Sequence, residues 1–231
     1  MLERWSTVYM ALAKHRNDTR VLVGPDVDLI VEGFPRCGNS YLVAWIEQAN
    51  PGLRVASHLH SYAHVRAALR QGVPTVVVTR DPEDAVASEI VRATFAGGTT
   101  TAWRLLWRYA RFHRAVARWA DDVILSPFAT TTGHPDLVAA ALRDRAGLDI
   151  EIAPPHGAAD VVSRVEEYSV AAIGRVDEMA VGRPSAERTA VAEAVKRELR
   201  DRHARRIDDL RTLHDALVSG PTAVHPVPNP R

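Results

Sequence analysis

The stretch that decides the fold of this chain is Leu29-Ile-Val-Glu-Gly-Phe-Pro-Arg-Cys-Gly-Asn-Ser-Tyr-Leu-Val-Ala-Trp45. It opens with a short apolar run that ends at Gly33, which is typical of a parallel strand covered on both faces. Pro35 and Gly38 then interrupt the apolar pattern and indicate a tight loop. Apolar residues return at helical spacing after the loop. The stretch therefore predicts a strand, a loop and the start of a helix.

The loop and the helix start predict an anion-binding site. Asn39 or Ser40 can cap the helix, and free backbone N–H groups meet the positive end of the helix dipole there. Arg36 adds a permanent charge with a forked donor geometry that suits phosphate or sulfate. The loop lacks the Gly-Lys-[Ser/Thr] ending of a Walker A motif. It is not a protein-phosphatase loop either, because Cys37 would need an arginine at the position of Val43.

A second strand-to-helix corner follows at residues 75–88. The β-branched run over residues 75–79 predicts a central strand. Asp81 and Pro82 fit the N-cap and the first position of a helix. Arg80 then places a guanidinium at the end of the strand, and Ser88 offers a hydroxyl two turns into the helix.

Together the two corners resemble the cofactor site of PAPS-dependent sulfotransferases. Pro35-Arg36-Cys37-Gly38-Asn39-Ser40-Tyr41-Leu42 is similar to that family's 5′-phosphosulfate loop, Pro-[Lys/Arg]-Ser-Gly-[Thr/Ser]-[Thr/Ser]-[Trp/Tyr/Phe]-Leu, and departs from it at Cys37 and Asn39. Arg80, Asp84 and Ser88 match the 3′-phosphate motif Arg-[Asp/Asn]-Pro-x-Asp-x-x-x-Ser. The motifs stand in the family's order, about 45 positions apart, and the resemblance covers roughly residues 28–90.

The resemblance implies two groups of cofactor contacts. Arg36 and the loop amides would bind the transferring group and the 5′-phosphate, whereas Arg80 and Ser88 would bind the 3′-phosphate. The implied cofactor-binding residues are Pro35, Arg36, Cys37, Gly38, Asn39, Ser40, Tyr41, Arg80 and Ser88. Cys37 is interpreted as a small loop residue where serine is usual, with an oxidation-sensitive thiol as the alternative.

His58 is the candidate catalytic base. A strand is expected over residues 53–57, and His58 and His60 follow its end, where α/β sheets gather catalytic groups. The family commonly has a Lys-Thr-His-Leu-Pro-like segment here; Ser57-His58-Leu59 matches its centre, with Ala56 and His60 in place of the lysine and proline. A histidine can take the acceptor's proton during sulfuryl transfer. In the alternative reading, both histidines are loop residues without a chemical role.

The implied function is transfer of a sulfuryl group from PAPS to a hydroxyl or amine of a small-molecule acceptor, which leaves PAP, with Arg36 and His58 as catalytic residues. Acceptor contacts are expected from residues 60–70, 97–107 and 153–175. The family's late Arg-Lys-Gly segment has no clear counterpart, the nearest being residues 174–175 and 182–184, and its Tyr-Glu-Asp-Leu-like segment is replaced by Ser126-Pro-Phe-Ala-Thr130. Two alternatives remain open: a P-loop kinase or NTPase, and a non-catalytic nucleotide-binding protein of the same fold.

Length and composition predict one α/β domain over residues 1–217, with three layers, a central parallel sheet of four to five strands, a P-loop-like site and a helical C-terminal part. A Pro-rich disordered tail is expected over residues 218–231. A net charge of +1 gives no sign of nucleic-acid or membrane binding. A single cysteine and the lack of a long apolar run favour a cytoplasmic enzyme. Monomer and homodimer both remain open.

Several helices and loops complete the expected architecture. Helices are expected over residues 3–15, 61–71, 82–94, 100–119, 135–146, 166–173 and 185–217, and a loop over 149–163. The helix over 100–119 carries an arginine stripe, interpreted as a solvated face with an anionic-acceptor or partner surface as the alternative; its members are Arg104, Arg108, Arg111, Arg114 and Arg118. Trp103 and Trp107 are expected in the core, with the lining of an acceptor pocket as the alternative.

Overall fold

The computed structural model describes residues 22–152, 158–173 and 186–226. A four-stranded parallel sheet forms its centre, in the order β2-β1-β3-β4. The strands are β1 (Leu29–Gly33), β2 (Val55–Ser57), β3 (Thr75–Thr79) and β4 (Ile124–Pro127). Apart from Pro127, every strand residue is buried, as the apolar and β-branched runs predict. The α/β fold class with a parallel central sheet is therefore confirmed.

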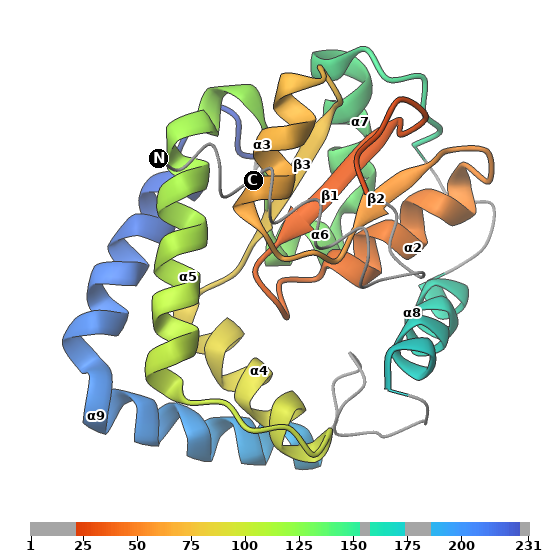
Figure 1. The fold of residues 1–231 in the computed structure, drawn as a ribbon. Helices are drawn as coiled ribbons and strands as arrows, with labels where there is room; N and C mark the ends of the chain where they lie inside the picture. Colours follow the sequence, from red (N-terminus) through yellow and green to blue (C-terminus); the bar gives the residue numbers. More distant parts are fainter. Residues whose placement is uncertain (1–21, 153–157, 174–185, 227–231) are drawn as a thin grey trace, which may run out of the picture.

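Helices cover both faces of the sheet (Figure 1). The helical elements are α2 (Asn39–Ala49), α3 (Tyr62–Arg70), α4 (Pro82–Phe95), α5 (Ala102–Val116), the 3-10 helix η1 (Ala117–Asp122), α6 (Phe128–Gly133), α7 (Pro135–Ala146), α8 (Ala158–Ile173) and α9 (Ala186–Val218). The chain moves from β1 outward to β2 and then returns past β1 to β3. Right-handed crossovers therefore place α2 and α3 on opposite faces. The strand order reverses at β1, and ligands of such sheets bind beyond the carboxyl ends of the strands at this point.

The long helix α9 runs beside α4 and then bends towards α5 (Figure 1). The bend lies at His203, whose φ of −137° is not helical. Basic residues of α9 pair with acidic residues at the start of α4: Lys196 with Asp84 at 2.5 Å, Arg200 with Glu83 at 2.6 Å, and Arg211 with Asp81 at 2.9 Å. Because Asp81 also caps α4 by accepting from the amides of Glu83 and Asp84, the start of α4 anchors α9.

Three sequence-based expectations are wrong about secondary structure. The loop expected over 149–163 ends earlier, because α8 begins at Ala158. The α2 N-cap is Gly38, at φ 98°, and neither Asn39 nor Ser40 caps the helix. The disordered tail does not begin at residue 218: Ala223 pairs with Leu125 of β4 in a parallel bridge and is buried. The expected helix over 3–15, residue 185 and residues 227–231 lie outside the described residues.

The remaining boundaries shift only slightly. Strand β2 begins two residues later than the sequence indicates, and α7 spans the expected residues 135–146. Among the described residues, no helix has the length and apolar character needed to cross a bilayer.

Candidate anion-binding and proton-transfer site

The loop between β1 and α2 needs its two glycines for different reasons. A Cβ on Gly33 would lie 2.4 Å from the carbonyl oxygen of Val78 on β3, so the close approach of the two strands requires glycine. Gly38 has a left-handed backbone, which leaves the first amides of α2 facing out of the helix. Arg36 also has a left-handed backbone, at φ 68°. The loop therefore holds a strained conformation of the kind that gathers at functional sites.

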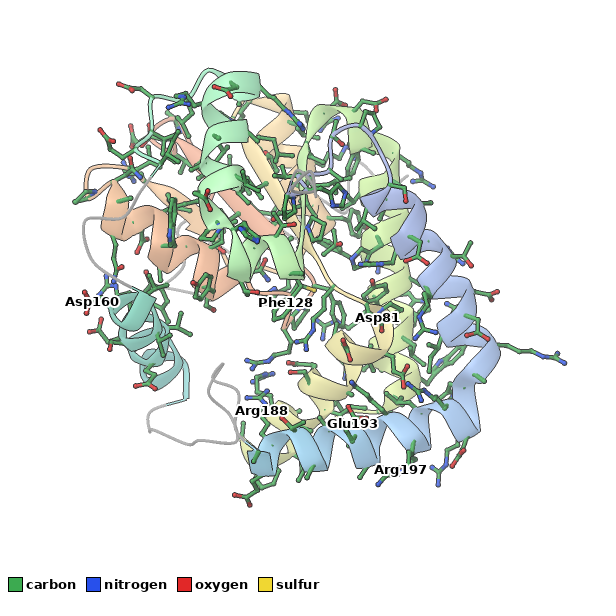
Figure 2. The ribbon with its side chains drawn as sticks, turned by 180° about the vertical axis from the view of Figure 1, so that it is seen from behind. Asp81, Phe128, Asp160, Arg188, Glu193 and Arg197 are labelled. Atoms are coloured by element: carbon green, nitrogen blue, oxygen red, sulfur yellow. The ribbon has the colours of Figure 1, made fainter. Side chains whose placement is uncertain are left out.

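Two arginines from distant parts of the chain donate to one hydroxyl, and a third contacts the loop beside them. Arg36 Nε donates to Ser88 Oγ at 3.2 Å, and Arg188 Nη2 donates to the same oxygen at 3.1 Å. Arg80 Nη1 donates to the carbonyl oxygen of Arg36 at 3.1 Å, and its guanidinium stacks 4.2 Å from the ring centre of Phe128. Figure 2 shows Arg188 reaching from the first turn of α9 towards Phe128. The site thus combines the β1–α2 loop, the end of β3, α4 and α9.

The arginines raise one another's electrostatic energy. The pKa of Arg36 is lowered to about 9, first by burial and then by the charge of Arg188, while Glu89 opposes the shift. Burial and the neighbouring charge of Arg80 likewise lower the pKa of Arg188. Glu89 is engaged by Arg92, which donates to it at 2.7 and 2.5 Å. A bound dianion would relieve this repulsion.

Three buried polar atoms near the arginines lack hydrogen-bond partners within the described residues. Asn39 Oδ1, Thr79 Oγ1 and Arg80 Nε are buried and have no hydrogen-bond partner in the described part of the chain. All three lie on the β1–α2 loop or at the end of β3. A guanidinium nitrogen can donate only, so Arg80 Nε is available to an anionic ligand.

His58 lies next to the loop. Its Nε2 is 2.9 Å from Ser40 Oγ, and its ring packs edge-on against Tyr168 of α8, with centroids 6.2 Å apart. The Tyr168 hydroxyl donates to Glu47 on α2, and burial together with this carboxylate raises the pKa of Tyr168. His58 and His60 both have positive φ, at 68° and 50°. The structure therefore places the candidate base beside the helix N-terminus and against α8, one of the segments expected to contact an acceptor.

Cys37 is structural. It is fully buried, and burial raises the pKa of its thiol to about 12 in spite of the nearby Arg80 and Arg36. The alternative of a low-pKa, oxidation-sensitive thiol is therefore wrong. Pro35 is also buried, and Tyr41 is partly buried with its pKa raised by desolvation.

Sequence reasoning missed Arg188. Its contact with Ser88 joins residues 100 positions apart, and no local motif surrounds it. The sequence placed the nearest counterparts of a late basic segment at residues 174–175 and 182–184. Those residues lie outside the described ones, and Arg188 follows them in the chain. The separate roles expected for Arg36 and Ser88 also change, because the Arg36 side chain lies at Ser88. Arg36 therefore lies together with Arg188 at Ser88 and not apart from it.

The arginine stripe lies elsewhere. Arg111, Arg114 and Arg118 line a surface pocket of about 290 Å³ together with Arg206 and Tyr62, and no site residue belongs to it. Trp103 and Trp107 are 59% and 46% exposed, so the expectation that they lie in the core is wrong.

Comparison with known proteins gave little. No family model matches the chain, and no curated protein does. Among solved structures it is similar to the mouse sulfotransferase SULT7A1 complexed with PAP, at 10% sequence identity and a TM-score of 0.43, over 84% of this chain and 89% of that one. At this level the similarity transfers no residue role and no activity to this chain.

Proposed function

We propose that this chain binds PAPS and transfers its sulfuryl group to a hydroxyl or amine of a small-molecule acceptor. The observation that carries the proposal is the meeting of Arg36, Arg80 and Arg188 around Ser88, beside the free amides that begin α2. A cofactor with phosphate groups at both ends of a nucleoside needs two anion sites close together. The arginine cluster and the helix N-terminus supply two.

The residues present fit that cofactor. Ser88 Oγ and the arginines around it suit the 3′-phosphate, because a dianion there offsets the charge that lowers the pKa of Arg36 and Arg188. The amides at the start of α2 and the Ser40 hydroxyl suit the 5′ end. When bound, PAPS would supply the activated sulfuryl group.

The chain's own residues supply proton transfer and charge stabilisation. His58 Nε2 is held at Ser40 Oγ, beside the 5′ end of the proposed cofactor site. Ser40 can turn its hydroxyl away from Nε2 to donate to a phosphate oxygen, which frees Nε2 to take the acceptor's proton. The α2 amides then stabilise negative charge that develops at the leaving group.

A His58→Gln variant tests the catalytic role. Transfer from PAPS to a panel of phenols, alcohols and amines should fall by about 10²- to 10⁴-fold, while PAP binding is retained. His134→Gln, a change at an exposed histidine, is the control and should leave both unchanged. Wild-type protein that binds PAP but transfers to none of these acceptors would favour the non-catalytic alternative. Equal transfer rates in wild type and His58→Gln would exclude His58 as the base.

A further inference from the structure

A buried carboxylate lies directly under the histidine loop. Glu32 is the fourth residue of β1 and has no exposed surface. Its Oε1 accepts from the backbone N–H of Leu59 at 3.0 Å and from His64 Nδ1 at 2.8 Å, and its Oε2 accepts from the N–H of His60 at 2.9 Å. Three donors, two of them from the segment that carries the candidate base, thus converge on one side chain.

The hydrogen bonds define the protonation states of Glu32 and His64. The backbone N–H of Val23 donates to His64 Nε2 at 3.0 Å, so Nε2 is an acceptor and the proton of the neutral ring lies on Nδ1. All three groups facing Glu32 are therefore donors, so an ionised carboxylate matches them, whereas the O–H of a protonated carboxyl would face no acceptor among them. Burial raises the pKa of Glu32, but the hydrogen bonds from His64 and the Leu59 amide favour the carboxylate, and the pKa is lowered.

The cluster holds a backbone that would otherwise relax. His58 and His60 both adopt the left-handed conformation, which is unfavourable for residues with a Cβ and persists only where surrounding contacts impose it. The contacts come from neighbouring residues of β1: Glu32 binds the amides of Leu59 and His60, and the Gly33 carbonyl accepts from His60 Nδ1 at 2.8 Å.

We propose that Glu32 is a positioning residue: it holds the backbone of residues 58–60 so that the His58 ring stays against Ser40. The inference rests on the proposed function for its catalytic meaning, because positioning matters if His58 moves a proton. Both Glu32 oxygens are already occupied by donors from the protein, so its role is to hold the loop. A shift of the base by about 1 Å costs up to about 100-fold in rate.

Glu32→Gln tests the positioning role with a readout that needs no acceptor. Glutamine presents an NH₂ group where the loop requires an acceptor, so at least one of the three donors loses its bond. The side-chain NMR signal of His58, assigned by its loss in His58→Gln, reports contact with Ser40. Ser40→Ala should shift this signal in the wild-type background and leave it unshifted in the Glu32→Gln background.

A matched control separates positioning from general destabilisation. Asn50→Ala removes a partly buried hydrogen bond to the Ile46 carbonyl and two exposed ones with the backbone of Glu151 at the other end of α2, without touching the histidine loop. In that background Ser40→Ala should still shift the His58 signal. If Glu32→Gln does not fold, Glu32→Asp keeps the charge but is one methylene too short, and the same loss of the shift is expected.

The outcomes distinguish this inference from the proposed function. If Ser40→Ala shifts His58 equally in wild type and in the Glu32 variants, the positioning role is overturned. PAP binding, measured on the same proteins by calorimetry, should be retained in Glu32→Gln because the arginine cluster is untouched. A wild-type protein that fails to bind PAP would overturn the cofactor proposal whatever the NMR result. With an active acceptor, the turnover number should fall by about 100-fold in Glu32→Gln, with little change in the KM for PAPS.

Discussion

Replacing Arg188 by methionine tests the arginine cluster most sharply. Methionine keeps an unbranched stem to fill the space of a side chain that is 7% exposed, but removes the charge and the donors. A hydrogen bond to a charged group is worth about 1.5–3 kcal/mol, and 1.4 kcal/mol is a factor of ten in affinity. Arg188→Met should therefore weaken PAP binding by about 10- to 150-fold.

The same change should not destabilise the free protein. After burial, the charge of Arg188 has the largest effect in lowering the pKa of Arg36. A group with a lowered folded pKa costs stability while it stays protonated, and Arg36 is protonated at neutral pH. Without Arg188 the pKa of Arg36 rises towards its ordinary value, so the cost at neutral pH becomes smaller. The melting temperature of ligand-free Arg188→Met should equal or exceed that of wild type at pH 7.

Titration calorimetry with PAP and thermal unfolding without ligand measure the two effects. Arg197→Met, an exposed arginine on the same helix, is the control and should change neither (Figure 2). Unchanged PAP affinity in Arg188→Met would refute the placement of the 3′-phosphate at Ser88. A lower melting temperature would refute the claim that repulsion within the cluster outweighs the hydrogen bond from Arg188 to Ser88.

Three further predictions concern the residues that support the site. Cys37 should react with iodoacetamide at pH 8 at least about 1000-fold more slowly in the folded protein than after unfolding. The reason is that its pKa of about 12 leaves little thiolate in the folded state. Fast labelling of the folded protein would contradict the burial of Cys37. Tyr109→Phe removes a 2.7 Å hydrogen bond to the Arg80 carbonyl and should cost about 1–3 kcal/mol in urea unfolding, and a smaller loss would mean that water replaces the hydroxyl. Gly33→Ala places a Cβ 2.4 Å from the Val78 carbonyl oxygen and should cost at least about 1–3 kcal/mol by the same assay, whereas wild-type stability would mean that the strands separate freely.

Local chemistry made the two strand-to-helix corners predictable. An apolar run, a glycine and a returning helical period specify the β1–α2 loop over short range, and Asp81 with Pro82 specifies the start of α4. Arg36 lies in the loop that follows β1, and Arg80 directly follows β3. The ends of parallel strands meet at one edge of the sheet. For these reasons the sequence indicated that Arg36 and Arg80 share one site.

Long-range contacts made the rest unpredictable. Arg188 joins the site only because pairs such as Lys196–Asp84 hold α9 along α4, and a helix of alternating charge looks like an ordinary solvated face in sequence. Glu32 looked like one polar residue in an apolar strand, and its three donors come from residues 27 to 32 positions away. The prediction that Asn39 or Ser40 caps α2 is wrong for a related reason. The Ser40 hydroxyl is hydrogen-bonded to His58, and the Asn39 side-chain amide donates to the Phe34 carbonyl.

The central claim is that one cluster of arginines recognises the 3′-phosphate of an adenosine cofactor. Calorimetry with PAP, ADP and ATP, each with and without Mg²⁺, tests it most directly. PAP should bind without Mg²⁺ and at least about tenfold more tightly than ADP, which lacks the 3′-phosphate. Mg²⁺-dependent binding of ATP that is tighter than that of PAP would contradict the claim and favour a P-loop kinase or NTPase.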